Sequence, residues 1–335
     1  MQRSKGRGFC THQVDSHGDE LPVASEPMWA DGKTSWILGV LLGGRTLPHI
    51  WRRVAVVATL SVVATWGYHR YPWLNLKVTP FTLIGVPLGI FLGFRNNASY
   101  DRFWEARKLW GSLVNTSRSL ARQITTFVDA PEGAADEVRR EQESLVRLVI
   151  AYVHALRHHL RDQDTKVGLD EILSPEELVR VSPQENVPIA LLATLGDRLA
   201  VARRKGWINV YHAPVIEQSL VSMTDVQGAC ERIKSTPIPY SYTVLLHRIV
   251  GSYCILLPFG LAQDLGWASI AVVVFVSYAL FGLDAIGDEI EQPFGLDVND
   301  LALFAISRTI EINLLRRIEA GPVPPPAKPK DGILD

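Results

Sequence analysis

Two groups of residues have types and spacings that suit catalysis or metal binding. His154 and His158 lie four residues apart, so on a helix they would share one face, as two metal ligands do. No H-E-x-x-H pattern supplies a base and no third ligand is evident, so a packed or solvated basic face is the simpler interpretation. The second group is an acidic cluster at the end of an apolar segment, where ion pairing at a helix end is the ordinary explanation: Asp284, Asp288, Glu289 and Glu291.

The known catalytic fingerprints are missing from the sequence. It has no P-loop, no G-x-S-x-G and no dinucleotide-binding pattern, because no strand precedes the glycine repeat described below. We therefore predict no catalytic residues, no metal and no cofactor, and we do not expect an enzyme.

A third pattern is apolar and lies in residues 78–94. Val86, Ile90 and Phe94 recur at every fourth position. Glycines one position earlier repeat with the same step: Gly85, Gly89 and Gly93. Such a row of small residues lets another helix approach closely. The apolar ladder beside it has two interpretations, a surface that faces lipid or a pore lining whose narrow part gates by dewetting.

The pore interpretation carries a consequence for assembly. One pore-lining helix per chain cannot enclose a conduit, so the protein would be an oligomer with its rotation axis along the pore.

The apolar residues gather in windows of near-membrane length. Four windows without Asp, Glu, Lys, Arg or His cover 54–68, 78–94, 249–263 and 265–283, which are 15, 17, 15 and 19 residues long. A membrane-spanning helix needs roughly 20 mostly apolar residues, so the shorter windows must include flanking residues. We expect an all-α protein with four transmembrane helices per subunit, although the first window also suits a buried helix of a soluble protein.

The remaining segments predict helices in water. The stretch 96–128 has no proline and the stretch 137–162 repeats the helical period, so both favour long amphipathic helices. Their apolar stripes are Tyr100, Phe103, Trp104, Leu109, Trp110 and Leu113 in the first helix, and Leu145, Leu148, Val149, Tyr152, Val153 and Leu156 in the second. Shorter helices are expected at 174–182, at 187–205 and from Pro214 to about Lys234.

The expected organisation has six parts. They are a disordered tail (1–34), an interfacial helix with spans one and two (35–94), a cytosolic helical domain (95–236), spans three and four (237–290), a cytosolic segment (291–320) and a disordered proline-rich tail (321–335).

The distribution of charge predicts the orientation of the chain. The segment before span one carries seven Lys and Arg residues, the connection between spans one and two carries two, and the turn between spans three and four carries none. Both termini and the helical domain are therefore expected in the cytoplasm. A net charge of −1 argues against a nucleic-acid partner.

Three segments resemble the bestrophin family in its bacterial branch. They are GIFLGFRNNASYDRFWEARKLWGSLV (89–114), AYVHALRHHLR (151–161) and GLDAIGDEIEQPFGLDVNDLAL (282–303). The resemblance covers roughly residues 35–320. It implies a homopentameric channel of the inner membrane, with one axial path for chloride and other small anions and constrictions in the membrane and at the cytosolic end.

The resemblance also assigns roles to individual residues. It places the membrane neck at Val86, Ile90 and Phe94, and the cytosolic constriction at Val215, directly after Pro214. The family's Arg-aromatic-Trp signature past the neck falls on Asp101, Arg102, Phe103 and Trp104.

The sequence departs from the family after Gly295. Calcium-gated members have a run of acidic residues there, whereas this chain keeps only Asp297 and Asp300 of five positions, so we do not expect calcium activation. The apolar neck carries no charge that would select anions over cations, so a cation-permeable channel of the same fold is an alternative. A secondary transporter is disfavoured because the sequence has no internal repeat. A membrane enzyme is disfavoured because catalytic motifs are missing. A membrane-anchored signalling scaffold is the remaining alternative.

Overall fold

The computed structural model of the chain describes residues 47–71, 77–130, 133–297 and 299–329. Helices account for the regular structure of these residues, and the β-type pairing among them is an isolated bridge between Val128 and Ile208. The expected tail at 1–34 and most of the expected interfacial helix lie outside the described residues, as do the last six residues of the C-terminal tail. Residues 321–329 form neither helix nor strand, as their prolines predict.

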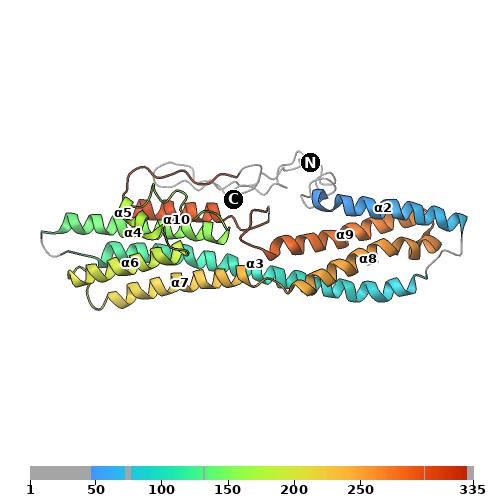
Figure 1. The fold of residues 1–335 in the computed structure, drawn as a ribbon, viewed down its shortest axis with the longest axis horizontal. Helices are drawn as coiled ribbons and strands as arrows, with labels where there is room; N and C mark the ends of the chain where they lie inside the picture. The colour runs from blue at the N-terminus through green and yellow to red at the C-terminus, as the bar shows by residue number, and fades with distance from the viewer. Residues whose placement is uncertain (1–46, 72–76, 131–132, 298, 330–335) are drawn as a thin grey trace, which may run out of the picture. The chain divides into compact units, whose positions relative to one another are not determined.

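The described helices follow one another through the chain as Figure 1 shows. They are α2 (Leu47–Arg70), α3 (Thr79–Phe127), α4 (Ala135–Leu160), α5 (Pro175–Val181), α6 (Val187–Arg204), α7 (Ala213–Ser235), α8 (Tyr240–Leu265), α9 (Ala268–Glu291) and α10 (Leu303–Arg317). The all-helical fold and the helices expected at 137–162, 174–182, 187–205 and 214–234 are confirmed. The largest single element is α3, which runs without interruption through Pro87 for 49 residues.

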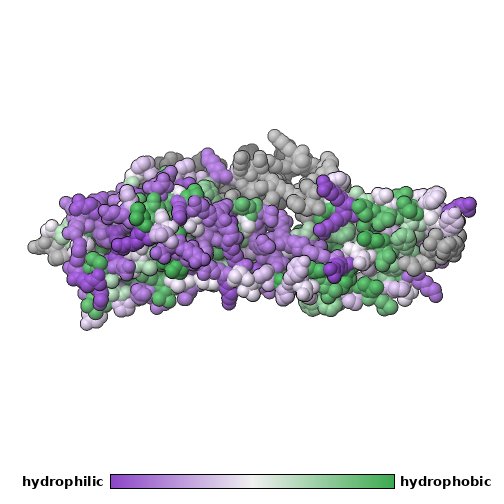
Figure 2. Space-filling model, viewed as in Figure 1, coloured by the Kyte–Doolittle hydropathy of each residue, from purple (hydrophilic) through white to green (hydrophobic). Residues whose placement is uncertain are grey.

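Helix α3 takes part in two separate apolar cores of residues 49–335. Its first part packs with α2, α8 and α9 around buried residues that come from all four helices: Ile50, Val57, Phe81, Leu88, Val250, Cys254, Leu257, Val273 and Phe281. Helices α8 and α9 are each long and apolar enough to cross a membrane. Figure 2 shows hydrophobic residues gathered over this group of helices and hydrophilic residues over the group that contains α4 to α7.

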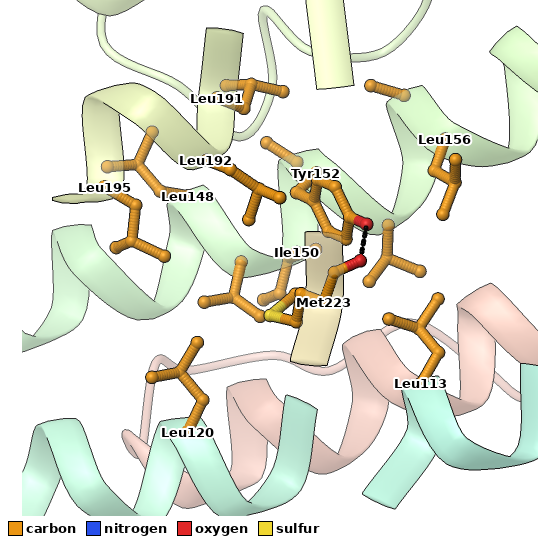
Figure 3. Packing of buried hydrophobic residues seen from close by; sticks show 14 of the residues in the cluster. Leu113, Leu120, Leu148, Ile150, Tyr152, Leu156, Leu191, Leu192, Leu195 and Met223 are labelled. Atoms are coloured by element: carbon orange, nitrogen blue, oxygen red, sulfur yellow. Dashed lines mark hydrogen bonds between the residues drawn. The ribbon is translucent and has the colours of Figure 1, made fainter. Parts of the chain in front are cut away.

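The second core joins the rest of α3 to α4, α6, α7 and α10. The stripe predicted for α4 is confirmed, because all six of its residues are buried there. Leu113 and Leu120 of α3 point toward the same core as Leu148 and Leu156 of α4 (Figure 3). The Tyr152 hydroxyl, whose pKa is raised by burial, donates a hydrogen bond of 3.0 Å to the carbonyl of Met223. This bond satisfies the polar end of a fully buried aromatic residue.

The stripe predicted for α3 is only partly right. Trp110 and Leu113 are fully buried, but Tyr100 and Trp104 are 54% and 49% exposed and stack on each other on the outside of the subunit. A three-to-four spacing identifies residues that share a face, and it does not say whether a second chain or the same chain covers that face.

Close helix contacts in the first core depend on glycines. A methyl carbon added at Gly260 of α8 would lie 2.5 Å from two ring carbons of Phe81 on α3, and one added at Gly85 would lie 2.8 Å from the Tyr253 hydroxyl. Gly266, with φ of 51°, occupies the left-handed region that favours glycine, and it makes the tight turn that lays α9 beside α8.

We predict opposite effects for two glycine substitutions in the same helix. Gly260→Ala should lower the free energy of unfolding by about 1–3 kcal/mol, because the new methyl group overlaps the Phe81 ring. Gly251→Ala should raise it by about 0.5–1 kcal/mol, because a methyl group there has no neighbour within 4 Å and alanine favours a helix. Thermal unfolding of the purified protein in detergent measures both, and equal effects of the two changes would contradict the packing described.

Candidate functional site

The apolar ladder lies on the face of α3 that points away from the rest of the subunit. Val86, Ile90 and Phe94 are 64%, 53% and 61% exposed. The buried residues of the same stretch, Leu88 and Leu92, lie on the opposite side at about 100° of rotation per residue. The chain therefore leaves its regular apolar ladder uncovered, which is the arrangement that a pore lining or a lipid-facing surface requires.

The predicted glycine row divides in the structure. Gly85 lies against Tyr253 of α8, as a packing glycine does, whereas methyl groups added at Gly89 or Gly93 would have no neighbour within 4 Å. Among the described residues of one chain, the close approach predicted from the small-residue spacing is present at Gly85 and absent at Gly89 and Gly93.

The residue after the ladder, Arg95, is the centre of a buried charge network. Its side chain is fully buried, and its guanidinium donates to the Asp284 carboxylate at 2.9 Å and also pairs with Asp288. Glu291 lies 3.9 Å away, and all three acids belong to α9. Ion pairing is thus confirmed for three of the four acids of the cluster, whereas Glu289 accepts a hydrogen bond from Asn299. The spacing of the acids did not identify Arg95 as the partner.

Two further helices contribute to this network. Nε2 of His247 on α8 lies 3.3 Å from Asp284 and 3.1 Å from Asp288, and Arg53 on α2 lies 3.6 Å from Asp284. Among the described residues, His247, Asp284 and Asp288 are the group whose ligand atoms come close enough to hold a metal ion. The guanidinium of Arg95 already occupies the position in which a cation would balance these carboxylates, so we assign the group to ion pairing.

The sequence carries a signal that could have identified the Arg95 network. A single basic residue ends the second apolar window, and acidic residues end the fourth. If both windows end at the same membrane boundary, these opposite charges are brought together in a medium where unpaired charge is costly.

The four signature residues after the ladder, 101–104, divide into two that face the rest of the subunit and two that are exposed. The Arg102 guanidinium donates to three backbone carbonyls, those of Ile233 (2.6 Å), Glu291 (3.1 Å) and Thr236. Burial lowers the pKa of Arg102, and Glu291 and Glu105 oppose that change. Arg102 thus connects the ends of α7 and α9 to α3, Phe103 packs against the second core, and Asp101 and Trp104 are exposed.

Val215 lies in the first turn of α7, near the end of α3 that is farthest from the ladder. The His212 ring, just before α7, stacks on Phe127 at the end of α3, with ring centroids 4.2 Å apart. Val215 is 45% exposed. Phe94 and Phe127 are separated by 33 residues of continuous helix, about 50 Å, so the two predicted constrictions lie near opposite ends of one helix.

The two histidines of the α4 pair have different partners. His154 pairs with Glu311 of α10 at 3.1 Å, whereas His158 contacts Gln163 and Arg157. Burial lowers the pKa of His158, and the neighbouring Arg157 lowers it further. Both side chains are packed between helices, which is the simpler of the two interpretations that the spacing allowed.

The acidic loop after α9 is folded onto itself. The Asp300 carboxylate accepts a hydrogen bond of 2.7 Å from the backbone N–H of Asp297, and Asn299 donates to Glu289. Burial raises the pKa of Asp300 to about 6. In this chain one of the two acids of the segment, Asp300, serves to close the loop.

Removal of Arg95 should be strongly destabilising. We expect Arg95→Met to lower the free energy of unfolding by about 3–5 kcal/mol, because the buried Asp284 carboxylate loses its buried partner and keeps only the more exposed His247 and Arg53 beside it. Asp284→Asn in the same chain should recover part of the loss. As a control, Arg232→Met removes the exposed pair with Glu105 and should cost less than about 1 kcal/mol. Chemical unfolding in detergent measures these values, and an Arg95→Met protein as stable as the control would refute the network's importance.

Comparison with known proteins gives a consistent result. The family model described as bacterial/fungal bestrophin protein matches residues 28–316. The chain is 43% identical over 272 residues to a voltage-dependent anion channel-forming protein of Ralstonia nicotianae, covering 80% of this chain and 87% of that protein. It is 40% identical over 283 residues to a protein of the same description from Escherichia coli K12, covering 84% and 90%. A solved bacterial bestrophin homolog from Klebsiella pneumoniae matches with a TM-score of 0.77 and 34% identity, covering 82% of this chain and 100% of that chain.

Proposed function

The chain belongs to the bacterial and fungal bestrophin family, and we propose that five copies form a channel that passes chloride and other small anions passively through an axial pore. The relatives from Ralstonia and Escherichia carry descriptions as anion channel-forming proteins, which supports the choice of anions. A cation-permeable channel of the same fold is the alternative that the uncharged neck leaves open.

One observation carries this proposal. The face of α3 that bears Val86, Ile90 and Phe94 is turned away from every described helix of its own subunit. In a ring of subunits around an axis that runs along α3, these three positions become three stacked apolar rings. Such rings form a neck in which water is unstable, and hydrated ions then cross a barrier that side-chain size controls.

We propose that the membrane contains α2, the first part of α3, α8 and α9. Their shared apolar core and the apolar composition of α8 and α9 support this assignment. The charged network around Arg95 would then lie at the cytoplasmic boundary, with residues 95–236 in the cytoplasm and both termini on the same side, as the distribution of Lys and Arg favours. The membrane would be the bacterial inner membrane.

Val215 is proposed as the second constriction. It lies in the first turn of α7, directly after the rigid backbone of Pro214, and it is near the end of α3 far from the neck. Five exposed valines around the axis would narrow the cytosolic exit without adding charge there.

The test of function compares substitutions on two faces of α3. Ile90→Ala and Phe94→Ala should raise chloride flux through purified channels in liposomes by about fivefold, the effect of a barrier lowered by about 1 kcal/mol. Phe91→Ala is the matched control: Phe91 is 51% exposed but lies about 100° around the helix from Ile90, so its removal should leave the flux unchanged.

Other outcomes would select the alternatives. Flux of sodium without chloride would favour the cation channel, and saturable exchange that needs substrate on both sides would favour a transporter. Correctly assembled Ile90→Ala and Phe94→Ala proteins that conduct like the wild type would show that the ladder faces lipid or a neighbouring helix.

A further inference from the structure

The exposed face that carries the ladder continues along α3 far beyond the neck. Eighteen residues make five full turns of an α-helix, so positions 18 apart point in the same direction. Leu88, Ala106 and Ile124 follow this step, and all three are at most 3% exposed. Helix α3 therefore keeps one side buried from the membrane core to its end, and the opposite side stays uncovered over the same length.

The same step connects the neck to a lysine. Ile90, Lys108 and Thr126 are 18 residues apart, and all three are exposed. Lys108 therefore lies directly in line with Ile90, about 27 Å further along the helix. Arg122 deviates from this line by about 40°, no more than Val86 and Phe94 do.

The chemistry of this line changes sharply after Phe94. All residues of this line are exposed, and past the neck all of them except Trp104 are polar or charged. The members within about 40° of Ile90 are Asn97, Asp101, Trp104, Lys108, Ser112, Asn115, Ser119, Arg122 and Thr126. A polar line of this length suits a water-filled vestibule rather than a lipid-facing or packed surface.

The line carries more positive than negative charge. Within the described residues, neither Lys108 nor Arg122 lies in an ion pair, and the Arg122 guanidinium lies over the ring of Phe127. Asp101 is the single acid on the line. The chain as a whole has a net charge of −1, so this excess of positive charge is a local feature of one face.

We propose that Lys108 and Arg122 form two cationic rings in the cytosolic vestibule and give the channel its preference for anions. This inference rests on the proposed function and supplies the charge that the neck lacks. Ten cations against five acids around an enclosed path would raise the local concentration of small anions before they reach the neck. The rings are about 21 Å apart along the helix, more than two Debye lengths at physiological salt, so each acts separately.

The experiment measures reversal potentials of full-length channels in planar bilayers under a tenfold sodium chloride gradient. Lys108→Gln should lower the chloride-to-sodium permeability ratio by about twofold or more, and Lys108→Glu combined with Arg122→Glu should move the reversal potential toward the sodium equilibrium value. In 1 M salt, where the Debye length is about 3 Å, the difference in conductance between wild type and Lys108→Gln should shrink.

The neighbouring residue provides the control. Arg107 is exposed and free of carboxylate partners in the described structure, but it lies about 100° around the helix from Lys108. Arg107→Glu should leave the reversal potential unchanged, and Lys108→Arg should keep the wild-type ratio. Size-exclusion chromatography checks assembly, and if the double variant does not assemble, the single Lys108→Gln change decides the question.

The outcomes separate this inference from the proposed function. A wild-type channel that selects anions, with Lys108→Gln and Lys108→Glu/Arg122→Glu channels that keep its reversal potential, would overturn the vestibule rings and leave the channel function intact. An equal shift on Arg107→Glu would also overturn them, because it would show a general surface effect. A wild-type reversal potential at the sodium value would contradict the anion channel itself and this inference with it.

Discussion

The arrangement of α3 depends on the ion pairs that the buried guanidinium of Arg95 makes with α9. A charged group that is fully buried away from water must be paired. The partners of Arg95 lie on α9, and two of them, Asp284 and Asp288, are within ion-pair distance. Pairing with Asp284 and Asp288 fixes both the depth and the rotation of α3 against α9. Because Phe94 and Ile90 precede Arg95 on the same rigid helix, the inward direction of Arg95 sets the outward direction of the ladder.

The continuity of α3 transmits this constraint from the membrane to the cytosolic domain. Glycine contacts to α8 hold its first part, and carbonyl contacts made by Arg102 join it to the ends of α7 and α9. Its last part lies in the core with α4, α7 and α10. Since one side of the helix is buried throughout, the proposed neck, the cationic line and the start of α7 are positioned by a single element. A channel built in this way couples the geometry of both constrictions to one rigid helix.

The sequence predicts much of this structure where a local pattern determines it. The period of Leu145, Leu148 and Tyr152 identified buried residues of α4, although residues 148–158 of that helix are buried on every side. The four-residue step of Val86, Ile90 and Phe94 identified the ladder. Patterns fail where the partner is distant in sequence. Tyr100 and Trp104 have the spacing of a buried stripe and are exposed, Gly89 and Gly93 have the spacing of a packing row and meet no described helix of their own chain, and the pairing of Arg95 with Asp284 spans 189 residues. These three depend on tertiary or subunit contacts that periodicity does not encode.

The most direct test of the proposed pore is a cysteine scan of residues 84–97 in channels whose natural cysteines, Cys10, Cys230 and Cys254, have been replaced. A charged, membrane-impermeant thiol reagent is applied while the current is recorded. We expect modification to change the current at 86, 90, 94 and 97, and to have no effect at the buried positions 88 and 92 or at 84 and 91, which face another direction. If modification changed the current at 84 and 91 but not at 86, 90 and 94, the assignment of the Val86, Ile90 and Phe94 face to the pore would be contradicted.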